Sequence, residues 1–153
     1  MRYWISLLVV SLVVLLAACR QADTGPQPPD IAYGQDMCDE CGMVIDQPKF
    51  AAATVLTTGE SHKFDDIGEM VAYHMEHPDQ TVEAWFVHDY YSEEWIRAET
   101  AYYIVSSELM TPMSFGVAAL ANAAEAAKLG QELGANVLTF DEMCLVVHIK
   151  AHG

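Results

Sequence analysis

The pattern of apolar and polar positions predicts that the folded part of the chain opens with a pair of short strands. Residues 50–57 are mostly small or β-branched, which is typical of a buried strand. Gly59-Glu60 predicts a tight turn into a second strand over residues 61–64. A third strand is indicated where polar and apolar side chains alternate over residues 81–87.

Between the second and third of these strands, apolar side chains follow the spacing of one helix face. They occupy positions i, i+3, i+4, i+7 and i+8, namely Ile67, Met70, Val71, His74 and Met75. Asp65-Asp66 can cap this helix, Glu69 three residues after Asp66 completes a capping-box pattern, and His77-Pro78 ends the helix. We therefore expect Met70 and Met75 to pack in the core rather than to bind a ligand.

The second half of the chain repeats this order of elements. Strands are predicted over residues 100–105, 115–120 and 136–140. Asn122 and Glu125 form a second capping-box pattern, which opens an alanine-rich helix that ends at Gly134. Asp141-Glu142 starts a last short helix that runs to about Ile149.

Two short correspondences suggest an internal repeat. Phe64-Asp65-Asp66 matches Phe140-Asp141-Glu142, each at an expected strand-to-helix junction, and Gly42-Met43 matches Pro112-Met113 upstream of them. Their common order predicts an α+β fold made of two pseudo-repeated ββαβ units. We place the two units at about residues 37–90 and 94–150.

The N-terminus carries the features of an export signal. Residues 5–16 form an apolar run that is too short for a membrane span and is typical of a signal peptide. Leu16-Ala17-Ala18-Cys19 resembles the lipobox of bacterial lipoproteins, in which the cysteine is acylated. An uncleaved anchor with a chance cysteine is the alternative. The sequence predicts a lipoprotein signal peptide over residues 1–18, a proline-containing lipidated tether over 19–30, and a folded domain over 31–153.

The composition narrows the classes of function. The chain has 153 residues, of which 52% are apolar, and a formal net charge of −15. The apolar content suffices for a core and argues against disorder. Seven lysines and arginines cannot form the basic face that nucleic acid requires, and the acidity disfavours binding to anionic lipid. We expect no nucleic-acid partner. Lipid on Cys19 would hold the protein to a membrane of the cell envelope, facing the periplasm or the cell exterior.

Three cysteines remain after removal of the signal peptide and lipidation of Cys19. They are Cys38, Cys41 and Cys144, an odd number that leaves at least one thiol free or bound to a ligand. The CxxC spacing of Cys38 and Cys41 admits a redox pair, a structural disulfide or part of a zinc site. A zinc site needs four ligands, and the chain has no second CxxC motif.

A fourth interpretation starts from the sulfur chemistry around Cys41. Cys41-Gly42-Met43 places a thiol and a thioether two residues apart, with a glycine that lets the backbone curl around an ion. Such soft ligands select Cu(I) over harder ions. Met43 and Met113 occupy turn-like segments of the two units, where pseudo-symmetry would bring them together at a shared site. His62 and His88, on predicted strands, stay open as further ligands.

The segments that carry these residues resemble a known family. Cys41-Gly42-Met43-Val44-Ile45 and Met110-Thr111-Pro112-Met113-Ser114-Phe115-Gly116 are similar to the two signature segments of the NosL family. Residues 123–142 resemble the helix, glycine and strand that follow in that family. The resemblance extends from about Met37 to Val147 and includes the lipobox. Ser114 departs from the family pattern, in which glycine is frequent at that position.

The resemblance implies a function and a set of ligands. NosL proteins are membrane-anchored copper chaperones of denitrifying and other nitrous-oxide-reducing bacteria. They bind one Cu(I) ion and consist of two ββαβ units. Carried over by position, Cys41 is the thiolate ligand, and Met43 and Met113 are the thioether ligands.

The resemblance also implies partners, and two other functions compete with it. The protein would deliver Cu(I) for assembly of the nitrous oxide reductase copper centre, with an ABC-transporter complex and the apo-reductase as partners and no catalytic residues. One alternative is a thiol–disulfide oxidoreductase that uses Cys38 and Cys41. The other is a passive copper buffer with the same ligands and no dedicated client.

Overall fold

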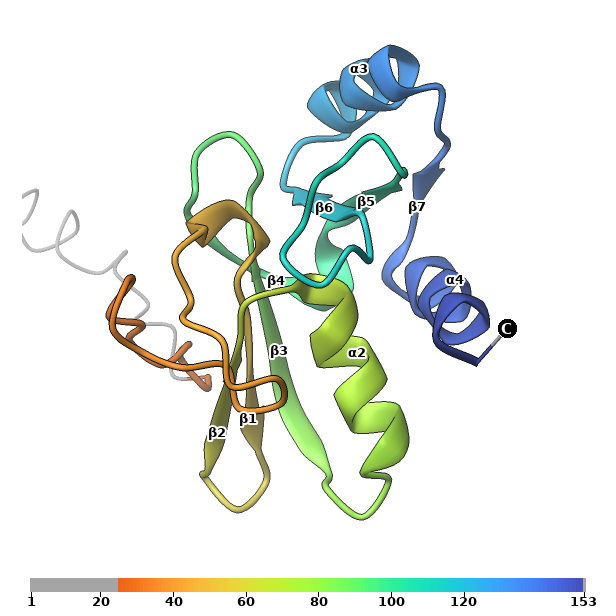
Figure 1. The fold of residues 1–153 in the computed structure, drawn as a ribbon. Helices are drawn as coiled ribbons and strands as arrows, with labels where there is room; N and C mark the ends of the chain where they lie inside the picture. The colour runs from red at the N-terminus through yellow and green to blue at the C-terminus, as the bar shows by residue number, and fades with distance from the viewer. Residues whose placement is uncertain (1–24, 153) are drawn as a thin grey trace, which may run out of the picture.

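The first half of the chain forms a four-stranded antiparallel sheet with a helix on one face (Figure 1). The computed structural model describes residues 25–152. The strands lie in the order β2-β1-β3-β4, with bounds β1 Ala52–Leu56, β2 Ser61–Phe64, β3 Val82–His88 and β4 Trp95–Arg97. Helix α2, Ile67–Glu76, connects β2 to β3. Ala52 pairs with Phe64 on one side and Val87 on the other, which places β1 in the middle of the sheet.

The second half repeats this topology with a smaller sheet. Its strands lie in the order β6-β5-β7, with bounds β5 Tyr102–Val105, β6 Val117–Leu120 and β7 Val137–Leu138. The other helices of the described residues are α3 Ala123–Leu133, α4 Phe140–His152 and the two 3-10 turns Pro48–Phe50 and Ala98–Thr100. Each unit runs strand, strand, helix, strand and places its first strand centrally. The prediction of an α+β fold with two ββαβ units is confirmed.

The short sequence correspondences, in contrast, join elements that are not equivalent. Phe64-Asp65-Asp66 ends β2 and caps α2, whereas Phe140-Asp141-Glu142 opens α4, after the third strand of its unit. The equivalent junction in the second unit is Leu120-Ala121-Asn122. Met43 likewise precedes β1, whereas Met113 lies between β5 and β6. The matches were wrong because acidic residues suit the start of any helix.

The two predicted capping boxes form only in part. Asp66 accepts a hydrogen bond from the Gly68 N–H, and Asn122 caps α3 in the same manner. Glu69, the expected second member of the first box, instead accepts a hydrogen bond from Cys38. Strand β4 was not predicted, because a three-residue strand depends on pairing with β3 rather than on its own pattern.

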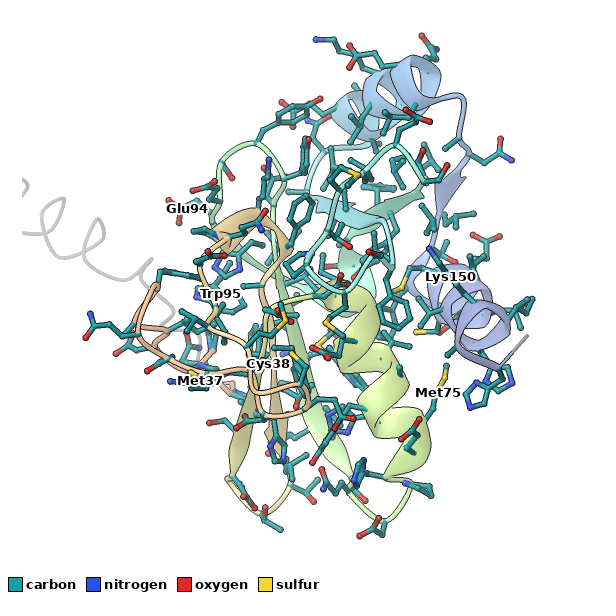
Figure 2. The ribbon with its side chains drawn as sticks, in the orientation of Figure 1. Met37, Cys38, Met75, Glu94, Trp95 and Lys150 are labelled. Atoms are coloured by element: carbon teal, nitrogen blue, oxygen red, sulfur yellow. The ribbon has the colours of Figure 1, made fainter. Side chains whose placement is uncertain are left out.

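The core extends through both units and includes the predicted face of α2. Ile67 and Met70 are fully buried, and Met75 is half-buried on the side of α2 that faces α4 (Figure 2). Within residues 25–152, no helix combines the length and apolar character needed to cross a membrane. The predicted signal peptide and lipidated Cys19 lie outside the described residues.

Candidate metal centre

A tight loop ahead of β1 carries the CxxC motif. The Gly42 N–H donates to the Cys38 carbonyl oxygen at 3.1 Å, and the Cys38 N–H donates to the Met43 carbonyl oxygen at 2.8 Å. Gly42 has φ +69°, a conformation that side chains with a Cβ rarely adopt. The glycine therefore closes the loop, as the sequence predicts, and turns Cys38 and Cys41 back toward each other.

Backbone hydrogen bonds fix this loop to β2. The Asp39 N–H donates to the Lys63 carbonyl oxygen at 2.9 Å, and the Lys63 N–H donates to the Asp39 carboxylate at 2.7 Å. Lys63 also forms an ion pair with Asp36 at 2.7 Å. Because β2 leads directly into α2, this attachment places both thiols beside the start of α2.

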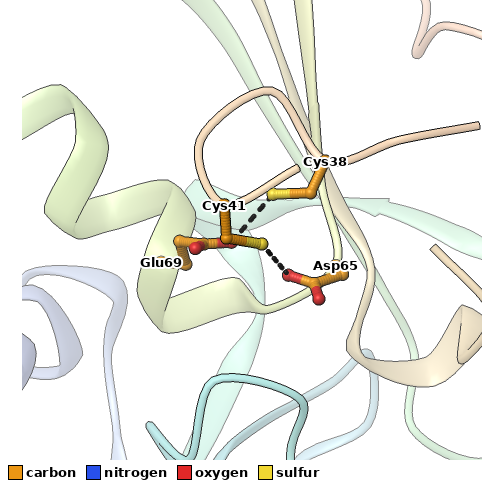
Figure 3. A group of neighbouring side chains, drawn as sticks. All are labelled: Cys38, Cys41, Asp65 and Glu69. Atoms are coloured by element: carbon orange, nitrogen blue, oxygen red, sulfur yellow. Dashed lines mark hydrogen bonds between the residues drawn. The ribbon is translucent and has the colours of Figure 1, made fainter. Parts of the chain in front are cut away.

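Two thiols and two carboxyl groups meet at that point (Figure 3). The Cys38 Sγ donates to Oε2 of Glu69 at 2.9 Å, and the Cys41 Sγ lies 3.7 Å from Oδ1 of Asp65. One potential ligand atom from each of these four residues lies within 4.8 Å of the others. We call this group the thiol–carboxylate cluster. Cys38, Asp65 and Glu69 are buried and Cys41 is half-buried, so the cluster is open on the Cys41 side.

Burial sets the protonation of the cluster. It raises the pKa of both thiols, and for Cys38 the hydrogen bond to Glu69 adds to this effect. Burial is also the largest cause of the raised pKa of Glu69, followed by the nearby Asp65. The thiols are therefore neutral in the metal-free protein. Oδ2 of Asp65 is buried and has no hydrogen-bond partner among the described residues.

The loop between β5 and β6 brings Met113 to the same end of α2 (Figure 1). Asp66 accepts hydrogen bonds from the Thr111 hydroxyl and, at 3.0 Å, from the Met113 N–H. Gly116 closes this loop with φ +67°, and a Cβ there would lie 2.2 Å from the Ser106 carbonyl oxygen. Asp66 therefore bridges the two units one residue away from Asp65.

Lys150 of α4 holds the same loop from its other side. Its Nζ donates to the carbonyl oxygens of Ser114 at 2.7 Å and Phe115 at 3.2 Å. Ser114, where glycine was the family expectation, adopts φ +61°. The serine is thus accommodated in a left-handed conformation, and the segment that carries Met113 is anchored at both Asp66 and Lys150.

The bridge at Asp66 yields a stability prediction. Asp66→Ala removes the cap of α2 and leaves the buried Thr111 hydroxyl and the Met113 N–H without an acceptor. We expect a loss of about 3 kcal/mol in the free energy of unfolding, measured by urea denaturation. Asp66→Asn, which keeps one acceptor oxygen, should lose less. An alanine variant as stable as the original protein would contradict the bridging role.

The structure brings the predicted ligands together only in part. Cys41 belongs to the thiol–carboxylate cluster. Met43 and Met113 lie on the two loops beside it, with side chains 44% and 37% exposed. Sequence reasoning missed Asp65 and Glu69, because both were assigned to helix capping alone. The acidic residues that directly follow the strand predicted over residues 61–64 were the sequence feature that could have indicated this part of the site.

The histidines contact other parts of the fold and do not belong to the thiol–carboxylate cluster. His88 uses both ring nitrogens, toward the Tyr33 hydroxyl and the Ala51 carbonyl oxygen. His74 is half-buried, and its Nε2 forms a hydrogen bond with the Thr54 hydroxyl. The Nδ1 of His62 lies 3.6 Å from the Asp39 carboxylate, and His62 is not a member of the cluster.

Comparison with known proteins gives consistent matches. The NosL family model matches residues 31–145. The copper-binding lipoprotein NosL of Stutzerimonas stutzeri is 29% identical over 150 residues, which cover 90% of this chain and 78% of that protein. The crystal structure of the copper chaperone NosL from Shewanella denitrificans superposes with a TM-score of 0.67. That match covers 76% of this chain and 96% of the other at 19% identity, so it shows the shared fold.

Proposed function

The chain belongs to the NosL family, and from this membership and its thiol–carboxylate cluster we propose that it binds Cu(I) and hands it to a client without catalysing a reaction. The observation that carries the proposal is the meeting of Cys41 with the loops of Met43 and Met113 at the start of α2. Named relatives are a copper-binding lipoprotein and a copper chaperone, not enzymes.

The proposed primary ligands are Cys41, Met43 and Met113. A thiolate and two thioethers form a soft set that suits Cu(I). The partial exposure of all three side chains supports transfer, because an incoming client ligand must reach the ion before the old ligands leave.

The client and the location follow from the family resemblance. The proposed client is the copper centre of nitrous oxide reductase during its assembly, with an ABC-transporter complex and the apo-reductase as partners. Lipid on Cys19 would anchor the protein to a membrane of the cell envelope, facing the periplasm or the cell exterior. The proposed role is therefore part of denitrification, or of nitrous oxide reduction more widely.

A thiol–disulfide oxidoreductase remains the second candidate, because Cys38 and Cys41 lie close enough to approach each other. The raised pKa of both thiols disfavours this function, since the attacking group in exchange must be a thiolate. A passive copper buffer would use the same ligands and differ only in having no client.

The first test concerns the choice of metal. We expect the protein to bind Cu(I) more tightly than Zn²⁺ by several orders of magnitude, because thioethers are poor ligands for zinc. Anaerobic competition against chromophoric chelators of each ion measures both affinities. Retention of zinc together with release of Cu(I) would contradict the proposal. Catalysed reduction of a peptide disulfide would favour the oxidoreductase instead.

A further inference from the structure

Cys38 is the one member of the CxxC motif that the proposed ligand set leaves unused. Its side chain is only 3% exposed, deeper than that of Cys41 in the same loop. Figure 3 shows its side chain on the loop, joined by a hydrogen bond to Glu69 of α2. Its side chain is part of the apolar core, but its thiol donates a hydrogen bond to Glu69, so this cysteine does more than fill space.

The geometry allows one ion to contact both thiols. The Sγ atoms of Cys38 and Cys41 lie within 4.8 Å of each other. Metal–thiolate bonds measure about 2.3 Å, so two sulfurs on opposite sides of one ion are about 4.6 Å apart. The two thiols are therefore close enough for one ion to bind both.

The surroundings of the two thiols favour a cation at this position. The carboxyl groups of Asp65 and Glu69 flank the sulfurs, and Oδ2 of Asp65 is buried without a hydrogen-bond partner among residues 25–152. Among the described residues, the ion pairs of lysine and arginine involve Asp36, Glu99 and Glu132, and not the carboxyl groups of the cluster. A bound positive ion would supply the counter-charge that these groups lack.

We propose that Cys38 is a second thiolate ligand, so that Cu(I) is held between Cys38 and Cys41, and that Met43 and Met113 are further ligands that exchange more easily. The inference rests on the proposed function and extends its ligand set. On binding, two Cu–S bonds form, each thiol releases its proton to solvent, and the copper stays Cu(I).

The difference in burial gives the two thiolates different tasks. Cys38 lies inside and is held by Glu69, so it retains the ion. Cys41 lies at the open side, next to the partly exposed methionines, so it is the ligand that a client replaces first. The site thus combines one permanent anchor with a set of ligands that can exchange one at a time.

The variant Cys38→Ser tests this assignment. Serine keeps the size of the side chain and a hydrogen-bond donor toward Glu69, but its hydroxyl is a poor ligand for Cu(I). Anaerobic chelator competition should show an affinity for Cu(I) at least about 100-fold weaker, since loss of an outer-shell partner alone costs 10- to 100-fold. Cys144→Ser, a cysteine in α4 outside the cluster, is the matched control and should bind as the original protein does.

A measurement on the unsubstituted protein avoids any effect of the variant on folding. With ¹³Cβ-labelled cysteine, addition of Cu(I) should shift the Cys38 and Cys41 resonances together and leave Cys144 in place. Cu(I) binding with an unmoved Cys38 resonance and unchanged affinity in Cys38→Ser would overturn the inference and leave the proposed function intact. Absence of Cu(I) binding by the unsubstituted protein would overturn both.

Discussion

Cys41→Ala is expected to abolish tight Cu(I) binding, with a loss in affinity of at least about a thousandfold, or about 4 kcal/mol. Cys41 supplies the thiolate at the open side of the cluster, and alanine offers the ion nothing in its place. Circular dichroism should show an unchanged fold, because the thiol is only half-buried and its hydrogen bond to Asp65 is long, at 3.7 Å. Chelator competition gives the affinity.

The same variant should change the pH dependence of binding. Burial raises the pKa of the Cys41 thiol, so the thiol is protonated at neutral pH and must lose its proton when copper binds. Affinity therefore rises with pH until the pH passes that raised pKa. The Cys41→Ala variant releases one proton fewer when copper binds, so its affinity depends less steeply on pH.

Met113→Leu is the matched control for this experiment. A thioether carries no proton in this range, so its loss should weaken binding by about 10- to 100-fold and leave the pH dependence unchanged. Unaltered affinity in Cys41→Ala would remove Cys41 from the ligand set. A shallower pH dependence in Met113→Leu would mean that the methionine acts indirectly through the cluster.

Local chemistry made most of the fold predictable from the sequence. The segment from β1 to β3 follows from alternation, a glycine turn and the apolar face of α2, each set by neighbours in the chain. Asp66 and Asn122 were correctly identified as caps for the same reason. The missed strand β4 depends on its pairing with β3, and the mismatched repeat concerns a relation between distant segments. Short motifs determine neither.

At the candidate site, too, features set by neighbouring residues were predictable and features set by the tertiary fold were not. Cys41 and Met43 were identified because thiol and thioether adjoin a glycine in one loop. Asp65 and Glu69 were assigned to helix capping, a local role, whereas the fold directs them to thiols on another loop. The anchor of Met113 at Asp66 joins the two units, and its hydrogen-bond geometry could not be predicted from either segment alone.

The second large effect is a stabilisation of the whole domain by copper. If Met43 and Met113 bind the same ion, copper links the loop ahead of β1 to the loop between β5 and β6. An ion that binds only the folded state should raise the free energy of unfolding by about 4 kcal/mol at a thousandfold excess over Kd. Urea denaturation of the metal-free and Cu(I)-loaded protein under anaerobic conditions measures the difference.

Hydrogen exchange can locate this stabilisation. The apo loops around Gly42 and Ser114 lie at the surface and should exchange quickly, since Met43 and Met113 are partly exposed and few side chains cover them. Copper should slow exchange in both loops at once, although Asp66 and Lys150 already anchor the second loop in the metal-free protein. Met113→Leu should retain the protection in the first loop and lose it in the second. Protection confined to residues 38–45 in the original protein would mean that a single loop holds the ion, and Met113 would then have a packing role only.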